Sequence, residues 1–131
     1  HDPCHTPIKT QPPIKVVTEL MGVNVRLNAR CCGESGTLAA TRADISTQVR
    51  FRKQEELERG AALLHTRDFK GDVKVLTSCP SCLQGLSRFR DDTRVEAEYI
   101  VVEIARHLLG DDWMSVFVRK VTHGGIERVL L

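Results

Sequence analysis

The chain is organised around the stretch Cys31-Cys32-Gly33-Glu34-Ser35-Gly36, in which two adjacent thiols are followed by a flexible turn. Three more cysteines complete a set of five: Cys4 near the start, and the two thiols of the motif Cys79-Pro80-Ser81-Cys82. All five lie at turn signals rather than within apolar periodic segments, where buried structural cysteines are more common. Their grouping therefore indicates a functional site.

The composition is that of an ordinary globular domain. A length of 131 residues predicts one compact domain over residues 1–131, large enough to bury a core without disulfides. Hydrophobic residues make up 41% of the chain, and its net charge of +2 comes from 19 basic and 17 acidic residues. Charge so evenly balanced argues against a nucleic acid as the partner.

The thiol content and the absence of long apolar runs bear on location. No run approaches the roughly 20 apolar residues that span a bilayer, so we expect no direct membrane insertion. An odd number of cysteines with an adjacent pair fits a reducing compartment, which predicts a cytoplasmic protein. Because the chain opens on His1, inside a motif, we expect it to be a fragment of a longer polypeptide.

The first half of the chain predicts two helices and a strand around the Cys-Cys pair. Residues 14–21 favour a short helix, and alternating apolar residues over 23–28 are typical of a strand that leads to Cys31. From Asp44, the expected N-cap, to His65 the pattern predicts one long amphipathic helix. Its charged run over residues 50–56 is interpreted as a solvated face.

In the second half of the chain, predicted strands and helices also alternate. Residues 73–76 predict a strand, and Pro80 suits the first position of a helix that runs to about Arg90. Asp91-Asp92 predicts a loop, residues 95–109 and 112–121 predict helices, and residues 126–131 predict a final strand or tail. The alternation indicates an α/β fold in three layers, with a largely parallel sheet flanked by helices.

Both cysteine motifs fall where a predicted strand passes into a helix. In parallel sheets such carboxyl ends of strands form the usual ligand-binding edge, so we expect the cysteine site there. Peptide N–H groups at a helix N-terminus favour thiolate over thiol, and thiolate is the form that binds metal. Soft thiolates select iron–sulfur clusters or zinc over hard cations, and four sulfurs suffice for either.

The motifs also carry a resemblance to a known family. His1-Asp2-Pro3-Cys4-His5, Cys31-Cys32-Gly33 with Gly36-Thr37, and Cys79-Pro80-Ser81-Cys82 resemble the cysteine-rich CCG domain. That domain occurs in heterodisulfide reductase and in the iron–sulfur subunits of glycolate oxidase and anaerobic glycerol-3-phosphate dehydrogenase. It also occurs in lactate-utilisation proteins and in fusions with flavin-linked D-2-hydroxyacid (D-lactate type) dehydrogenases, which look most similar. The resemblance spans His1 to about Gly110.

What the resemblance implies is electron transfer through a [4Fe–4S] centre, which is non-cubane in the heterodisulfide reductase branch. The implied ligands of this cluster are Cys4, Cys31, Cys32, Cys79 and Cys82. FAD is expected on the rest of the parent oxidoreductase, and the implied partners are its flavin dehydrogenase module and further iron–sulfur modules. The parent complex would be cytoplasmic or peripheral to the inner membrane, and the isolated domain would lack a complete active site.

Two other functions remain open from the residues alone. Four thiolates could hold a structural zinc, or Cys79 could attack and Cys82 resolve in metal-free dithiol chemistry. No catalytic residue is assigned. His5, next to Cys4, is a candidate hydrogen-bond donor to a sulfur, and Glu34 either lies beside the thiols, where its charge would raise their pKa, or points to solvent.

Overall fold

A computed structural model describes residues 1, 13–22, 24–34, 37–66 and 69–124. The chain divides into two compact units, His1–Ile100 and Val101–Leu131. None of the helices in the described part of the chain combines the length and hydropathy of a transmembrane span.

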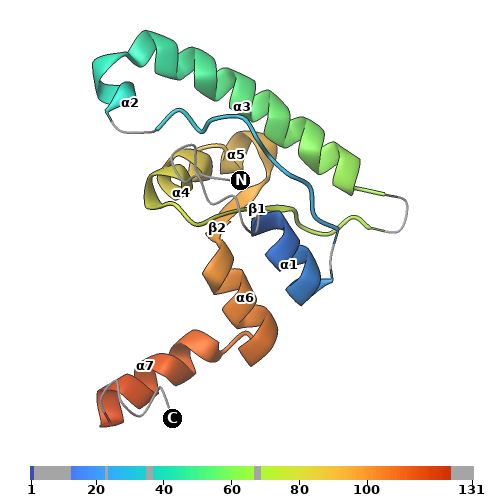
Figure 1. Ribbon diagram of the computed structural model, residues 1–131, viewed down its shortest axis with the longest axis vertical. Coiled ribbons are helices and arrows are strands. Elements are labelled where there is room, and N and C mark those ends of the chain that lie inside the picture. Colours follow the sequence, from blue (N-terminus) through green and yellow to red (C-terminus); the bar gives the residue numbers. More distant parts are fainter. Residues whose placement is uncertain (2–12, 23, 35–36, 67–68, 125–131) are drawn as a thin grey trace. The chain divides into compact units, whose positions relative to one another are not determined.

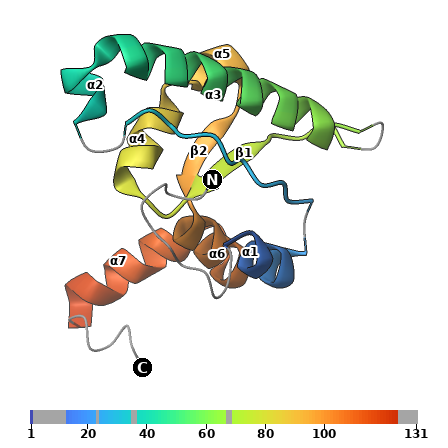
Figure 2. The ribbon, with the colours of Figure 1, turned by 45° about the horizontal axis from the view of Figure 1, so that its top comes forward.

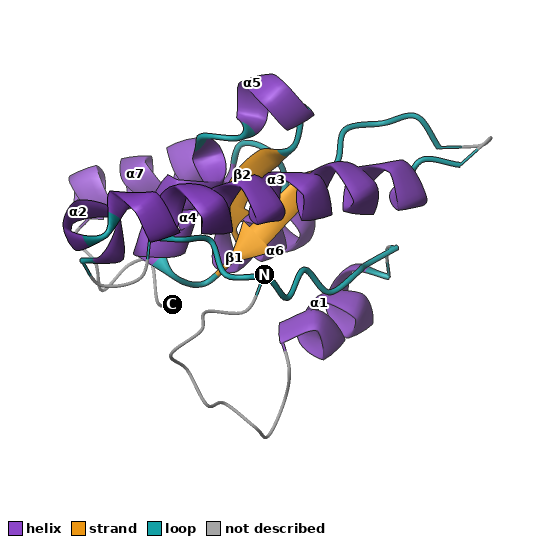
Figure 3. Cartoon of the chain, turned by 90° about the horizontal axis from the view of Figure 1, so that it is seen from above, coloured by secondary structure: helices purple, strands orange, loops and turns teal. Residues whose placement is uncertain are grey.

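The first unit is built on a β-α-β arrangement. Strand β1 (Lys74–Thr77) pairs in parallel with β2 (Glu96–Tyr99), with Lys74 opposite Glu96 and Thr77 opposite Tyr99. Between the strands lie helix α4 (Pro80–Ser87), which contacts both of them, and the short α5 (Arg90–Thr93). In the described part of the chain the sheet has two strands, drawn side by side in Figure 3. The predicted α/β fold with a parallel sheet is confirmed.

Helix α3 (Ala43–Leu64) is the longest element and supplies one side of the core. It contacts the short helix α2 (Leu38–Thr41) and α5, and it crosses the unit beside them in Figures 1 and 2. The core is one cluster of apolar side chains and thiols from α3, β1, α4 and the loops next to them. Its members are Cys32, Leu57, Ala61, Val75, Cys82, Leu86, Phe89 and Val95.

Helix α1 (Pro13–Met21) lies in the first unit where a short helix was predicted. Helix α6 (Ile100–Leu109) leads into the second unit, which also contains α7 (Trp113–Gly124). Neither α6 nor α7 has a buried residue, and Arg106 pairs with Glu103 within α6. The predicted strand or tail over 126–131 lies outside the described residues.

Three predicted elements were wrong. Of the strand predicted over 23–28, residues 24–28 form no strand, and the N–H groups of Ala29 and Arg30 that follow them bond to the Glu56 carboxylate; Val23 lies outside the described residues. The helix predicted over 95–109 begins only at Ile100, since pairing with β1 draws residues 96–99 into β2. Asp91 and Asp92 lie in the first turn of α5 rather than in a loop, a position that favours acidic side chains.

Two details of α3 also differ from expectation. Its N-cap is Arg42 rather than Asp44, and Asp44 instead pairs with the Arg42 guanidinium at 2.8 Å. The charged run over residues 50–56 is not wholly solvated, because Lys53 in its middle is completely buried.

Candidate metal or redox centre

Cys79 and Cys82 are positioned by the turn from β1 into α4. The strand ends at Thr77, Cys79 is the N-cap of α4, and Pro80 occupies the first helical position. The Thr77 hydroxyl oxygen accepts a hydrogen bond from the N–H of Cys79 at 3.3 Å. The thiols therefore lie at the carboxyl end of β1, as the sequence predicted.

The two thiols of this turn have opposite electrostatic surroundings. The N–H of Cys82 donates to the Cys79 sulfur and lowers the pKa of Cys79 more than partial burial raises it. Burial, followed by the neighbouring Cys32 and Cys79 thiols, raises the pKa of Cys82. The predicted preference for thiolate at the start of this helix thus holds for Cys79 and is reversed for Cys82.

The Cys-Cys-Gly segment reaches the same place without regular structure of its own. Gly33 has φ +80°, a conformation that suits glycine, and its N–H donates to the Cys31 sulfur at 3.4 Å. The buried Ser46 of α3 donates its hydroxyl to the Gly33 carbonyl at 3.0 Å. These contacts bring Cys32 into the core, where it is fully buried.

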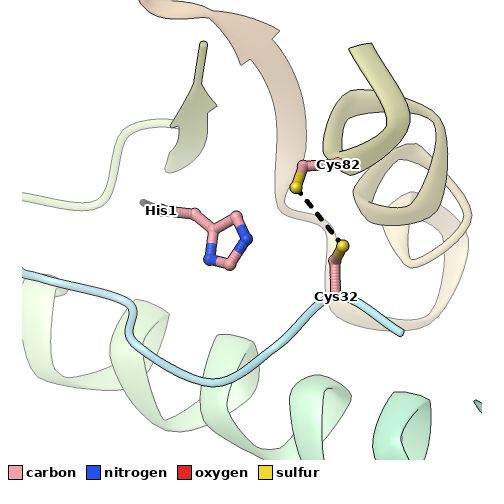
Figure 4. A group of neighbouring side chains, drawn as sticks. All are labelled: His1, Cys32 and Cys82. Carbon is pink, nitrogen blue, oxygen red and sulfur yellow. Dashed lines mark hydrogen bonds between the residues drawn. The ribbon is translucent and has the colours of Figure 1, made fainter. Parts of the chain in front are cut away.

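Cys32 and Cys82 come together from segments 50 residues apart. Their sulfurs lie 3.4 Å apart, and the two side chains point toward each other in Figure 4. Both are free thiols, as are Cys31 and Cys79, which are half-buried. Two thiolates on one tetrahedral zinc, each about 2.3 Å from the ion, would lie roughly 3.8 Å apart. The pair is therefore close to the spacing that a shared metal atom requires.

His1 is the third member of this group, and sequence reasoning missed it. Its imidazole faces the two thiols in Figure 4, and one of its ring nitrogens lies within 4.8 Å of both sulfurs. The backbone nitrogen of His1 donates to Leu76 O of β1 at 2.7 Å, and ring Nδ1 lies 3.1 Å from Asn28 O. Nδ1 also lies 3.3 Å from the Lys53 ammonium, which only donates, so it stands between an acceptor and a donor and these contacts do not assign the tautomer.

Glu34 links the two cysteine segments through ion pairs. Its carboxylate bonds to Arg50 of α3 at 2.7 Å and to Arg88, just after α4, at 2.6 Å. The side chain packs on Gly85 so closely that a Cβ at that position would overlap Glu34 Cγ. Since 8% of the Glu34 side chain is exposed, the alternative in which it points to solvent was wrong.

Lys53 and Glu56 of α3 hold the segment that precedes Cys31. The Lys53 ammonium donates to Arg30 O at 2.7 Å and to Glu56 Oε2 at 2.9 Å, while Glu56 accepts from the N–H groups of Ala29 and Arg30. Both residues fall in the run that was interpreted as a solvated face. Three-residue spacing on one helix was the only sequence signal that could have paired them.

Of the predicted ligands, the structure brings Cys32 and Cys82 together with His1 and places Cys79 beside Cys82. Cys31 adjoins Cys32 in the chain, but its sulfur is not part of the three-residue group. Cys4 and His5 lie outside the described residues, so the five-cysteine ligand set stays a prediction. The donor set fits a soft metal, because thiolates and imidazole are the ligands that zinc and iron–sulfur centres use. The geometry defines a cysteine-rich α/β domain with a group able to hold a metal.

Comparison with known families agrees with this class. Residues 1–87 match the family model described as CCG, Cysteine-rich domain, so the chain belongs to the CCG cysteine-rich domain family. Residues 87–131 match a second model, described as Domain of unknown function (DUF3400). No curated protein and no solved structure shows a significant match. The resemblance seen in the sequence is confirmed over residues 1–87, whereas the particular parent enzyme and the single domain over 1–131 stay predictions.

Proposed function

We propose that the chain is an iron–sulfur redox domain that passes electrons from a flavin-linked 2-hydroxyacid dehydrogenase module to an acceptor. The observation that carries this proposal is the convergence of two CCG-family cysteine motifs at the carboxyl end of β1, with Cys32 and Cys82 3.4 Å apart. A bound cluster would supply one-electron chemistry at this point. The flavin, the hydroxyacid site and the other iron–sulfur modules belong to the proposed parent protein.

In this proposal the chain's own residues bind the cluster, orient it and exclude water. The predicted ligands are Cys4, Cys31, Cys32, Cys79 and Cys82. Burial of Cys32 and Cys82 would exclude water from their sulfurs, whereas Cys31 and Cys79 are half-buried and lie nearer to solvent. The N–H groups that donate to the Cys31 and Cys79 sulfurs stabilise negative charge there.

A second candidate is a zinc site, which the His1–Cys32–Cys82 group favours. One imidazole and two thiols within 4.8 Å of one another form a mixed donor set that is common for a single zinc ion. A further thiol from Cys31 or Cys79 would complete four ligands. In that case the metal would stabilise the fold and no electron would move.

Anaerobic purification separates these functions. We expect visible absorption near 400 nm with stoichiometric iron and sulfide in the wild-type protein, and loss of both in Cys32→Ser. A colourless protein that contains zinc would replace the first proposal by the second. If protein prepared without oxygen binds no metal, even after reconstitution with iron and sulfide, both metal functions are ruled out. The metal-free dithiol chemistry of Cys79 and Cys82 is then the function that remains.

Val75→Ala is the matched control for Cys32→Ser. Val75 belongs to the same buried cluster, but its side chain has no atom that could bind a metal. Its truncation should therefore lower stability without removing a ligand. Unchanged cluster content and spectrum in Cys32→Ser would contradict the assignment of Cys32 as a ligand.

A further inference from the structure

Lys53 is the most deeply buried charged side chain described near the thiols. Its side chain has no exposed surface, although it comes from the charged face of α3. Lysine is almost never buried so completely unless a partner lies beside it. Its ammonium group donates to the carbonyl oxygen of Arg30, the residue directly before Cys31, and to Glu56.

In the pair formed by Lys53 and Glu56, the ammonium group lies against the His1 ring. Lys53 Nζ lies 3.3 Å from His1 Nδ1, on the ring that faces Cys32 and Cys82. Glu56 is directed instead to the N–H groups of Ala29 and Arg30, and 19% of its side chain is exposed. Water screens the carboxylate more than the ammonium, so the two charges do not cancel at the site.

The groups that influence the pKa of Lys53 differ from those that influence the pKa of Glu56. Burial lowers the pKa of Lys53, while Glu56 and the Cys32 and Cys31 thiols act to raise it. For Glu56, burial acts to raise the pKa, but Lys53 and the two backbone N–H groups lower it further, and no thiol contributes. Both the Glu56 carboxylate and the two thiols thus favour the charged form of Lys53.

We infer that Lys53 is the charge-compensating residue of the thiol site, whose buried ammonium group stabilises the negative charge that thiolate ligands bring to a bound metal. This inference rests on the proposed metal-binding function. A divalent ion with three or more thiolates carries net negative charge, as does a cluster held by cysteines, and each electron added increases that charge. A fixed cation in a dry environment stabilises the more negative state most.

The inference predicts shifts of opposite sign for the two members of the pair. Lys53→Met removes the cation while keeping a side chain of similar length, so the midpoint potential of the cluster should fall. Affinity of the metal-free protein for Co²⁺ should also weaken, by about 10-fold to 100-fold, as for other groups that surround a metal's ligands. Glu56→Gln removes the neighbouring negative charge and should raise the midpoint potential.

The experiment compares the wild-type chain with three variants, all prepared without oxygen. Midpoint potentials are measured by spectroscopic redox titration after reconstitution with iron and sulfide, and Co²⁺ affinity is measured by competition with a chelator. Leu57→Ala is the matched control: Leu57 is the buried neutral neighbour of Glu56 in α3, and it packs in the core cluster with Cys32. Urea denaturation of each variant gives its loss of stability.

The outcomes separate this inference from the proposed function. The role of Lys53 would be overturned if Lys53→Met matched wild type in both midpoint potential and Co²⁺ affinity. It would also be overturned if Lys53→Met and Glu56→Gln shifted the midpoint potential in the same direction. Wild-type protein that binds Co²⁺ but no cluster would overturn electron transfer, and the Co²⁺ affinities would still decide the role of Lys53. Wild type that binds neither would overturn both. If Lys53→Met does not fold, the inference is tested by Glu56→Gln. A rise in its midpoint potential supports the inference, and no rise overturns it.

Discussion

The two cysteine segments reach the same site by different means. The segment with Cys79 and Cys82 lies between a strand and a helix and is held by local structure: the end of β1, the N-cap position of Cys79 and Pro80 at the start of α4. The segment with Cys31 and Cys32 has no regular structure. It is held by side chains of α3 and by an ion pair with Arg88, which is 54 residues from Glu34.

The Cys79–Cys82 segment is fixed by residues next to it in the sequence, whereas the Cys31-Cys32 segment is fixed by tertiary contacts. A helix N-terminus presents its N–H groups wherever the helix forms, so the state of Cys79 follows from α4 alone. The position of Cys32 depends on Ser46, Lys53 and Glu34 all finding their partners. Damage to the tertiary contacts should therefore affect the Cys31-Cys32 segment first.

The largest effect is expected where both segments share a core. Leu86 of α4 is fully buried in the cluster that contains Cys32 and Cys82. Leu86→Ala should lower the free energy of unfolding by about 2–5 kcal/mol, because it removes apolar contacts and leaves a cavity. Urea denaturation measures the loss. Leu83→Ala is the control, at a half-buried position of the same helix, and it should lower the free energy of unfolding less. Equal losses of unfolding free energy in the two variants would contradict a shared core beneath both segments.

A smaller effect is expected where the two segments touch. In Gly85→Ala the new methyl group would overlap Glu34 Cγ, and two arginines hold that side chain in place. We expect a loss of about 1–3 kcal/mol in unfolding free energy, as for other overpacked sites.

A double-mutant cycle identifies the cause of that loss. In a Glu34→Ala background the clash is absent, so Gly85→Ala should cost little or even gain stability, since alanine favours a helix. A cost of Gly85→Ala that is the same in both backgrounds would rule out Glu34 as its source.

Loss of one tertiary hydrogen bond tests the Cys31-Cys32 segment alone. Ser46→Ala removes the hydroxyl that donates to Gly33 O inside the protein, and should lower the free energy of unfolding by about 1 kcal/mol. Alkylation of Cys32 in the metal-free protein should become faster as the segment loosens. Thr47→Ala removes an exposed hydroxyl one residue further along α3 and serves as control. Equal alkylation rates in both variants would show that Ser46 does not hold the segment.

The smallest effect is expected at the locally determined segment. Pro80 is exposed and occupies the first helical position, where its fixed φ suits the helix. Pro80→Ala should cost less than about 1 kcal/mol, mainly through a more flexible unfolded chain. Chemical denaturation and the alkylation rate of Cys79 check this. A large change in either would mean that the segment is not determined by α4 alone.

Much of the fold could be read from local patterns. Helix α3, strand β1 and the start of α4 at Pro80 lie where apolar periodicity and turn residues predicted them. Strand β2 could not be recognised, since residues 96–99 are extended only because β1 provides a parallel partner. The segment before Cys31 has the alternation of a strand, yet its N–H groups bond to a carboxylate on α3.

By itself the sequence determined the class of protein and the set of thiols, because cysteine spacing, turn residues and helical periodicity are local properties of the chain. It also determined that a helix begins at Pro80. Only the tertiary structure decided that Cys32 meets Cys82, that His1 joins them and that Lys53 is buried beside His1. These depend on side chains far apart in sequence that meet only once the core has closed.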